Sequence, residues 1–226
     1  MGSLGIILGS GSAGLIPSAD GVVPLNRHGD WTPEAVADGA YVLPHEIDHE
    51  RNLRSLAEAG CDRVLGISSV GGLRPDLLPG TYIAPDDFIA LDVPPLSSAK
   101  GVDAHIAPGF DFEWRREVVD AIRGATEIVD GGVYWQVVGP RLETPAEVRM
   151  IAQHAHVVGM TAASECIAAA EMGLSYASLC VVDNLANGVA SLGLTAADVR
   201  EGQLEHRPEL EAVLASALGA LTIQGP

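Results

Sequence analysis

Short apolar runs alternate along this chain with longer segments that have the spacing or composition of helices. The short runs have the length of buried strands, and they cover residues 5–8, 22–25, 64–67, 81–84, 133–138, 157–160 and 176–182. The longer segments read as helices that pack on one face, and they cover residues 45–59, 113–123, 145–155, 164–172 and 207–221. This alternation predicts an α/β fold, a single domain over residues 1–226 with a central, mainly parallel or mixed sheet flanked by helices.

Turn-forming residues set the expected boundaries of these elements. Gly60 is expected to end the helix before it, and Thr144 followed by Pro145 is a typical helix start. The glycine-rich segments 9–12 and 68–73 are expected to be turns that leave strands. Residues 92–112, which contain several prolines and glycines, are expected to form a long surface loop.

Charge and cysteine content narrow the class of protein. The net charge of −17 and the absence of any Lys/Arg run exclude a nucleic acid or an anionic membrane as the main partner. No stretch of about 18 apolar residues predicts a membrane span, and the apolar first residues lack the basic start of a secretory signal. We therefore expect a soluble cytoplasmic protein. Cys61, Cys166 and Cys180 form no CxxC pair and are expected to be reduced core thiols.

Polar side chains that could bind an anion follow several expected strands. Ligands of an open α/β sheet bind outside the carboxyl ends of its strands, so these side chains are candidates for one site. The loop 9–12 offers backbone N–H groups and hydroxyls, although a plain tight turn also explains it. It lacks the third glycine of a dinucleotide fingerprint and the lysine of a P-loop, which disfavours NAD and ATP. Arg27-His28 and Ser68-Ser69 offer further donors, with a solvated surface pair and a simple turn as alternatives.

Glu143 and Asn184 are isolated polar residues beside expected strand ends. A carboxylate accepts from ring N–H and exocyclic NH₂ donors, while a carboxamide accepts and donates along one edge. This is the chemistry that binds the edge of a purine. A helix N-terminal charge for Glu143 and an Asx turn for Asn184 are the alternatives at this point.

Five ordered motifs carry a family resemblance. They are GIILGSG at 5–11, NRHGD at 26–30, SSVGGLRPDLLPG at 68–80, GPRLETPAEVRMIA at 139–152 and VVGMTAASE at 157–165. From residue 5 to about 189, the chain resembles the trimeric purine nucleoside phosphorylase and 5′-methylthioadenosine phosphorylase family. The resemblance implies an enzyme for a purine nucleoside, with inorganic phosphate as co-substrate and no metal or other cofactor. It also implies a homotrimer or a dimer of trimers, in which a histidine near His105 can reach a neighbour's site.

The resemblance also implies roles for individual residues. The implied phosphate site consists of Ser10, Arg27, His28, Ser68, Ser69 and Thr161. The implied substrate-binding positions are Val70, Gly71, Leu142, Glu143, Val158, Met160, Asn184 and Ala186. Met160 would lie under the ribose, and Leu142 stands where a phenylalanine usually stacks near the base. The implied catalytic residues are Arg27 and His28, which hold the attacking phosphate below the sugar, and Asn184, which stabilises the departing purine at N7 and O6.

The two base-binding residues imply the substrate class. Glu143 and Asn184 match the pair in 6-oxopurine phosphorylases, whereas adenosine-type enzymes tend to have Ser and Asp there and a further Asp where this chain has Ala186. The resemblance therefore implies inosine, guanosine or 5′-methylthioinosine as substrate, cleaved with inversion to the free base and α-(deoxy)ribose 1-phosphate. The 5′ group and the choice between hypoxanthine and guanine stay open.

Other functions also stay open. The family usually has another basic residue and a histidine where this chain has Asp30 and Thr32, and about eight extra residues follow before Pro44. This departure keeps a nucleoside hydrolase, or an altered-substrate enzyme on the same scaffold, as an alternative. A 5′-methylthioadenosine phosphorylase and a noncatalytic purine-binding protein are the remaining alternatives.

Overall fold

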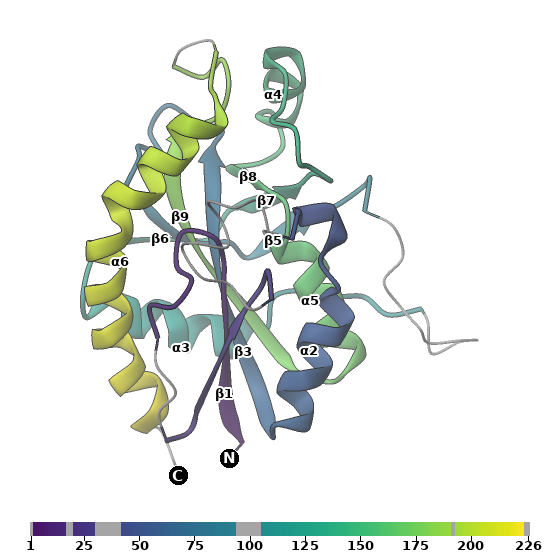
Figure 1. Ribbon diagram of the computed structural model, residues 1–226, viewed down its shortest axis with the longest axis vertical. Coiled ribbons are helices and arrows are strands. Elements are labelled where there is room, and N and C mark those ends of the chain that lie inside the picture. Colours follow the sequence, from purple (N-terminus) through teal and green to yellow (C-terminus); the bar gives the residue numbers. More distant parts are fainter. Residues whose placement is uncertain (1, 17–19, 30–41, 94–104, 191–192, 224–226) are drawn as a thin grey trace.

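The computed structural model describes residues 2–16, 20–29, 42–93, 105–190 and 193–223. These residues form one α/β domain, in which five α-helices flank a curled, mixed sheet of nine strands (Figure 1). The strands are β1 (Ser3–Leu8), β2 (Val22–Asn26), β3 (Cys61–Gly72), β4 (Tyr82–Ala84), β5 (Asp87–Ile89), β6 (Ile128–Asp130), β7 (Val133–Gln136), β8 (Val157–Gly159) and β9 (Ser175–Leu185). The helices are the short 3₁₀ turn η1 (Pro44–Glu46), α2 (His49–Glu58), α3 (Phe112–Arg123), α4 (Pro145–Ile151), α5 (Ala162–Glu171) and α6 (Ala196–Ile223). The predicted fold class is confirmed.

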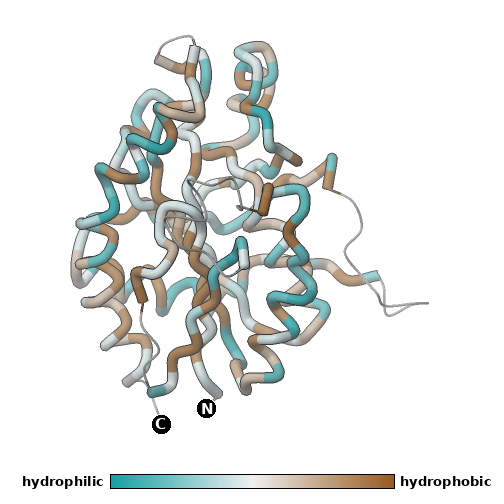
Figure 2. The backbone as a smooth tube through the Cα atoms, viewed as in Figure 1, coloured by the Kyte–Doolittle hydropathy of each residue, from teal (hydrophilic) through white to brown (hydrophobic). Residues whose placement is uncertain are grey.

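Side chains along the central strands point alternately to the two faces of the sheet and form a hydrophobic layer on each face. Leu4, Ile6 and Leu8 of β1 belong to a cluster with α3 and α6, while Ile7 belongs to a cluster with α2 and α5. Successive side chains of a strand point to opposite faces, so one run of apolar residues serves both layers. Figure 2 shows this division, with brown along the central strands and teal on the outer sides of the helices. Cys61, Cys166 and Cys180 are buried and free, as expected.

The long strand β3 organises the sheet. Its first half pairs in parallel with β1, its last two residues, Gly71 and Gly72, pair antiparallel with β8, and β9 runs parallel to it along almost its whole length. The prediction that residues 68–73 form a turn is therefore wrong up to Gly72. Pairing with β9 keeps this segment extended, and β8 pairs with Gly71 and Gly72 on the other side. These glycines tolerate close neighbours that a side chain would displace. At Gly72, a Cβ would lie 2.8 Å from the Leu77 carbonyl oxygen.

Two helix boundaries also differ from the prediction. The helix expected from residue 45 begins at His49, because the Asp48 side chain accepts from the Arg51 amide and caps it there. The helix expected from residue 207 begins at Ala196, where Thr195 and Asp198 cap each other's amides. Pro208 lies inside this helix, and the apolar spacing on which the prediction rested begins only at Leu210.

The short strands β5 and β6 were not predicted, because three residues carry too little pattern. The expected loop 92–112 lies partly outside the described residues, and its described part at 105–111 has no helix or strand. In Figure 1 the carboxyl ends of β1 and β3 point upwards, towards α4 and the start of α6. The start of β1 and the end of α6 lie at the opposite end of the molecule.

Candidate active site

The register of the sheet brings the predicted site residues to one edge. Leu8 of β1 pairs with Asn26 of β2 and with Ile67 of β3, so Gly9, Arg27 and Ser68 follow side by side. Further along β3, Gly71 pairs with Val158 on one side and with Asn184 on the other. These are the ends at which an α/β sheet binds ligands. The residues implied for phosphate and those implied for the base therefore occupy two ends of one row.

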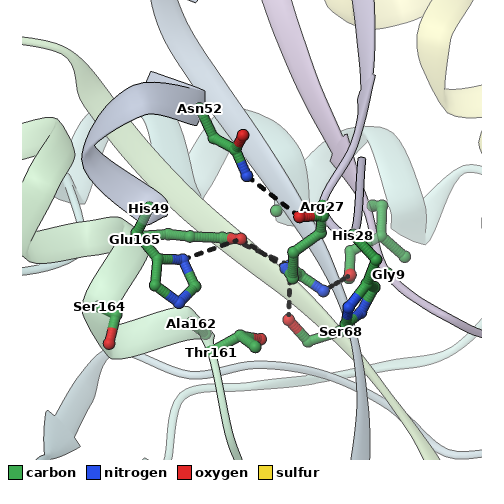
Figure 3. Close-up of polar contacts among 12 residues, drawn as sticks. Gly9, Arg27, His28, His49, Asn52, Ser68, Thr161, Ala162, Ser164 and Glu165 are labelled. Atoms are coloured by element: carbon green, nitrogen blue, oxygen red, sulfur yellow. Dashed lines mark hydrogen bonds and ion pairs between the residues drawn. The ribbon is translucent and has the colours of Figure 1, made fainter. Parts of the chain in front are cut away.

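Arg27 lies at the centre of a buried network (Figure 3). Its Nε and Nη2 atoms form a bidentate pair with Glu165 of α5, and the Nη2–Oε2 distance is 3.0 Å. Nη1 donates to the Ile67 carbonyl over 3.0 Å, and Nη2 is 3.3 Å from the Ser68 hydroxyl. Tyr176 donates to the second oxygen of Glu165 over 2.6 Å. Most guanidinium N–H groups are thus bound within the protein, and the positive charge of Arg27 is balanced by Glu165.

Two glycines make this network possible. A Cβ at Gly9 would collide with the Arg27 guanidinium, and a Cβ at Gly66 would collide with the Tyr176 hydroxyl and lie 2.9 Å from Glu165. Such approaches require a residue without a side chain. Gly9 of the first motif therefore serves to admit Arg27.

The charges of this network shift the pKa values of its members. Burial alone would raise the pKa of Glu165, but the charge of Arg27 and the hydrogen bonds that it accepts hold that pKa below its ordinary value. Burial, reinforced by Arg27, lowers the pKa of His28 to about 4. Burial also lowers the pKa of His49 to about 4, although Glu165 lies 3.8 Å away. Both imidazoles are therefore neutral at pH 7. The Nδ1 atom of His28 lies 2.7 Å from the Val42 carbonyl, which makes it the donor.

Thr161 stands at the start of α5, but its hydroxyl makes no capping hydrogen bond. The Tyr134 hydroxyl instead accepts from the amides of Thr161 and Ala162, at 3.1 and 3.3 Å. Gln136 accepts from the Ser164 amide over 3.0 Å. Because side chains from β7 cap this helix, the Thr161 side chain is not needed for that purpose.

Helix α6 contacts two of the residues that the resemblance implies for phosphate, Ser10 and Ser69. Gln203 donates from Nε2 to the hydroxyls of Ser10 and Ser69, each over 3.0 Å. His206 is 3.1 Å from the buried Asp183 carboxylate. Burial raises the pKa of Asp183, while hydrogen bonds from Ser69 and His206 act in the opposite direction.

The base side of the cluster is more apolar. A Cβ at Gly71 would be 3.2 Å from Val158 and 3.5 Å from Ala186, so these three predicted positions are in contact. Met160 lies against Gly139, where a Cβ would be 2.5 Å from its sulfur. Val70 is buried, whereas Leu142 is only partly buried.

The two polar residues of the base side make few hydrogen bonds to the rest of the protein. Asn184 is partly buried and donates to the Leu185 carbonyl over 3.0 Å. Glu143 is 9% exposed, and burial raises the pKa of its carboxyl group. The carbonyl of Glu143 accepts from Asn187 over 3.1 Å, which ties the Glu143 loop to the segment after β9.

Several residues of the site were not assigned a role from the sequence. Glu165 is the last residue of the fifth motif and could have been paired with Arg27, since an acidic protein with a buried arginine needs a counter-charge. Tyr176 and Gln203 gave no local signal, because one looks like a core aromatic and the other like a polar helix residue. Asp30 and Thr32 lie outside the described residues.

The described residues were also searched for metal and membrane features. They contain no group of three or more His, Cys, Asp or Glu side chains placed to hold a metal ion. Among the described helices, none combines the length and hydrophobicity needed to cross a bilayer.

Comparison with known proteins identifies the family. A profile described as "Phosphorylase superfamily" matches residues 18–219. The chain belongs to the phosphorylase superfamily. A probable 6-oxopurine nucleoside phosphorylase of Archaeoglobus fulgidus is 37% identical over 77% of this chain and 72% of its own length. A purine nucleoside phosphorylase of Streptomyces coelicolor is 35% identical over 89% of this chain and 74% of its own.

Other superfamily members extend the comparison. A probable S-methyl-5′-thioinosine phosphorylase of Methanothermobacter thermautotrophicus is 32% identical over 77% of this chain, and the match spans 62% of that protein. Among solved structures, methylthioadenosine phosphorylase from Schistosoma mansoni in complex with adenine superimposes with a TM-score of 0.81. It covers 99% of this chain and 93% of its own at 22% identity, which supports the phosphorylase fold.

Proposed function

We propose that this superfamily member is a purine nucleoside phosphorylase that cleaves the N-glycosidic bond of 6-oxopurine nucleosides with inorganic phosphate. One observation supports the proposal: on β3, Ser68 contacts Arg27, and Gly71, three residues later, pairs with Asn184. Relatives named for 6-oxopurine nucleosides and 5′-methylthioinosine agree with this substrate class. The products are the free base and α-(deoxy)ribose 1-phosphate.

The proposed mechanism follows from charge. As the glycosidic bond loosens, the sugar gains oxocarbenium character and the purine becomes anionic. Phosphate held by Ser10, Ser68, Thr161 and the Arg27-His28 pair stabilises the cation before it attacks C1′. Asn184 binds N7 and O6 of the departing purine, and Glu143 accepts from N1 and N2. Ala186 contributes no carboxylate, which disfavours a 6-aminopurine.

A panel of nucleosides with and without phosphate tests the proposal. Inosine, guanosine, 5′-methylthioinosine, adenosine and 5′-methylthioadenosine should be followed by absorbance in phosphate and in phosphate-free buffer. We expect phosphate-dependent cleavage of the 6-oxopurine nucleosides, with adenosine turned over more slowly. Cleavage only of the 6-aminopurine nucleosides would overturn the base assignment.

One observation favours a second candidate, a nucleoside hydrolase on the same scaffold. The Arg27 charge is balanced by Glu165, so the described site has less net positive charge than an isolated arginine would give it. A hydrolase would release free ribose at the same rate without phosphate, and the same panel detects this. Binding of hypoxanthine without turnover in either buffer would select a purine-binding protein instead.

The proposal also covers the oligomeric state and the cellular compartment. We infer a cytoplasmic homotrimer, or a dimer of trimers, with phosphate as co-substrate and no metal. Light scattering after gel filtration should give three or six times the chain mass of 23.4 kDa. Turnover should be unchanged after treatment with a chelator.

A further inference from the structure

The C-terminal helix α6 inserts one side chain between two of the implied phosphate-binding hydroxyls. We propose that Gln203 is a positioning residue that orients the Ser10 hydroxyl towards phosphate and separates the anion from the Asp183 carboxylate. The proposal rests on the proposed phosphorolysis, and its test below separates the failure of one from the failure of the other.

The hydrogen bonds fix the direction in which each hydroxyl donates. The Nε2 atom of Gln203 lies 3.0 Å from both Ser10 Oγ and Ser69 Oγ, so each of its two hydrogens can serve one hydroxyl. Ser69 also hydrogen-bonds to the Asp183 carboxylate, to which it must donate. Ser69 therefore accepts from Gln203, which sets the orientation of the amide. Ser10 likewise accepts from Gln203, and its own proton is left to point to the anion.

The helix is held firmly enough to act in this way. At Gly202, a Cβ would collide with the Asp183 carbonyl, so α6 lies directly against β9. Arg207, one turn after Gln203, donates to the carbonyls of Gly11 and Ala13 over 3.2 and 2.8 Å. Positions three and four apart on a helix share a face, so Gln203, His206 and Arg207 all reach the strand ends.

The charges nearby give Gln203 a second effect. Asp183 is 5% exposed and lines the same small cavity as Gly11, which belongs to the loop proposed to bind phosphate. The cavity bounded by Gly11, Ser69, Asp183 and Gln203 is only about 10 Å³, the size of about one water molecule. Phosphate is too large for this cavity, and on this proposal it lies on the far side of Gln203 from Asp183. A neutral amide at this position keeps two anions apart without adding to the charge.

Two substitutions separate these effects. Gln203→Ala removes the donor, and we expect the KM for phosphate to rise about tenfold, the loss of one well-placed hydrogen bond. Gln203→Glu keeps the size of the side chain but replaces the amide donor with a carboxylate. The Ser10 hydroxyl would then donate to this carboxylate and not to phosphate, so the KM for phosphate should rise further. In both variants the KM for the nucleoside, kcat at saturating phosphate and the Tm should stay near wild type. Leu204→Ala, an exposed change on the same helix, is the matched control.

The outcomes are distinct. A wild-type phosphate KM in both Gln203 variants would overturn the inference, and so would an equal loss of Tm, nucleoside KM and phosphate KM, which indicates a merely structural role. If the wild type shows no phosphate-dependent cleavage, the proposed function fails. Calorimetric titration with inorganic phosphate then tests Gln203 directly, because weaker binding by Gln203→Glu than by wild type supports the inference and equal binding overturns it.

Discussion

Two buried glutamates at opposite ends of the site have opposite electrostatic environments. Glu165, fully buried beneath the phosphate end, is paired with Arg27 and accepts from Tyr176, and its pKa is held below the ordinary value. Glu143, at the base end, is nearly as buried, but no arginine side chain forms an ion pair with it among the described contacts, and burial raises its pKa. The ionised form of Glu165 is thus stabilised by its neighbours, whereas burial destabilises the ionised form of Glu143.

The difference separates structural from functional polar groups. Removing one partner of a buried ion pair leaves an uncompensated charge and destabilises the fold. A buried charge with few partners costs stability, and it is retained where a ligand supplies the missing donors. Loss of Glu165 is therefore expected to unfold the protein, whereas changes at Glu143 and Asn184 are expected to change the substrate.

The largest effect is expected for Glu165→Gln. The substitution leaves the buried Arg27 without a counter-charge, which typically costs about 3–5 kcal/mol. Urea unfolding of the variant and of wild type measures this loss in the free energy of unfolding. Glu143→Gln is the matched control at the base end, where the same chemical change should leave the protein as stable or more stable at pH 7. Equal effects of the two substitutions would remove the contrast.

The next largest loss of stability is expected for a substitution at Gly66, which lies close to Tyr176 and Glu165. Gly66→Ala introduces a Cβ that collides with the Tyr176 hydroxyl and crowds Glu165, and overpacking of this kind costs about 1–3 kcal/mol. Gly219→Ala is the control, because Gly219 lies exposed in α6 with nothing within 4 Å of a Cβ. The control should gain up to about 1 kcal/mol from helix propensity. Thermal or urea unfolding that ranks the two variants in the reverse order would contradict the geometry of the network.

At the base end, Asn184→Asp should change specificity more than stability. The carboxylate replaces the donor of the amide with acceptors, which suits a 6-amino group and repels a 6-oxo group. We expect the ratio of kcat/KM for inosine over adenosine to fall about tenfold, equivalent to one mismatched hydrogen bond. Asn184→Ala should lower both values without reversing the preference. An unchanged ratio in Asn184→Asp would remove this residue from base recognition.

The smallest effect at neutral pH concerns the ionisation of Glu143. Burial raises the pKa of this carboxyl group, so it becomes protonated at a higher pH than an exposed glutamate and then no longer accepts from the purine. The kcat/KM for guanosine should therefore fall as the pH decreases through this raised pKa. In Glu143→Gln that acid limb should be absent and activity low throughout. If kcat/KM of Glu143→Gln still falls over the same pH range as in wild type, the fall is due to the titration of another group.

The raised pKa of Glu143 also determines how the stability of the protein changes with pH. The folded protein holds the Glu143 proton to a higher pH than the unfolded chain, so the folded state binds more protons between the two pKa values and stability falls as the pH rises there. For Glu165 the relation is reversed. Its lowered pKa gives stability that is present above the unfolded pKa and is lost as the pH falls through the folded one.

The sequence alone determined the class of fold and most of its elements. Apolar runs in β1, β3 and β9 are long enough to be buried on both faces, and periodicity fixes such strands without knowledge of their neighbours. The five motifs likewise carried the family resemblance, which the superfamily match over residues 18–219 confirms. Local signals also placed Thr144 and Pro145 at the start of α4, where a capping box with Glu147 is observed.

Only the tertiary structure decided how the polar residues are used. Arg27 and Glu165 are 138 positions apart, and Ser10 and Gln203 are 193 apart, so no local pattern links either pair. The extended course of β3 through Ser68 to Gly72 also depends on β8 and β9, which supply hydrogen bonds that its own glycine-rich sequence does not specify. Periodicity records which face of an element is buried, whereas ion pairs and shared hydroxyls depend on which elements meet, and that is determined by packing of the whole chain.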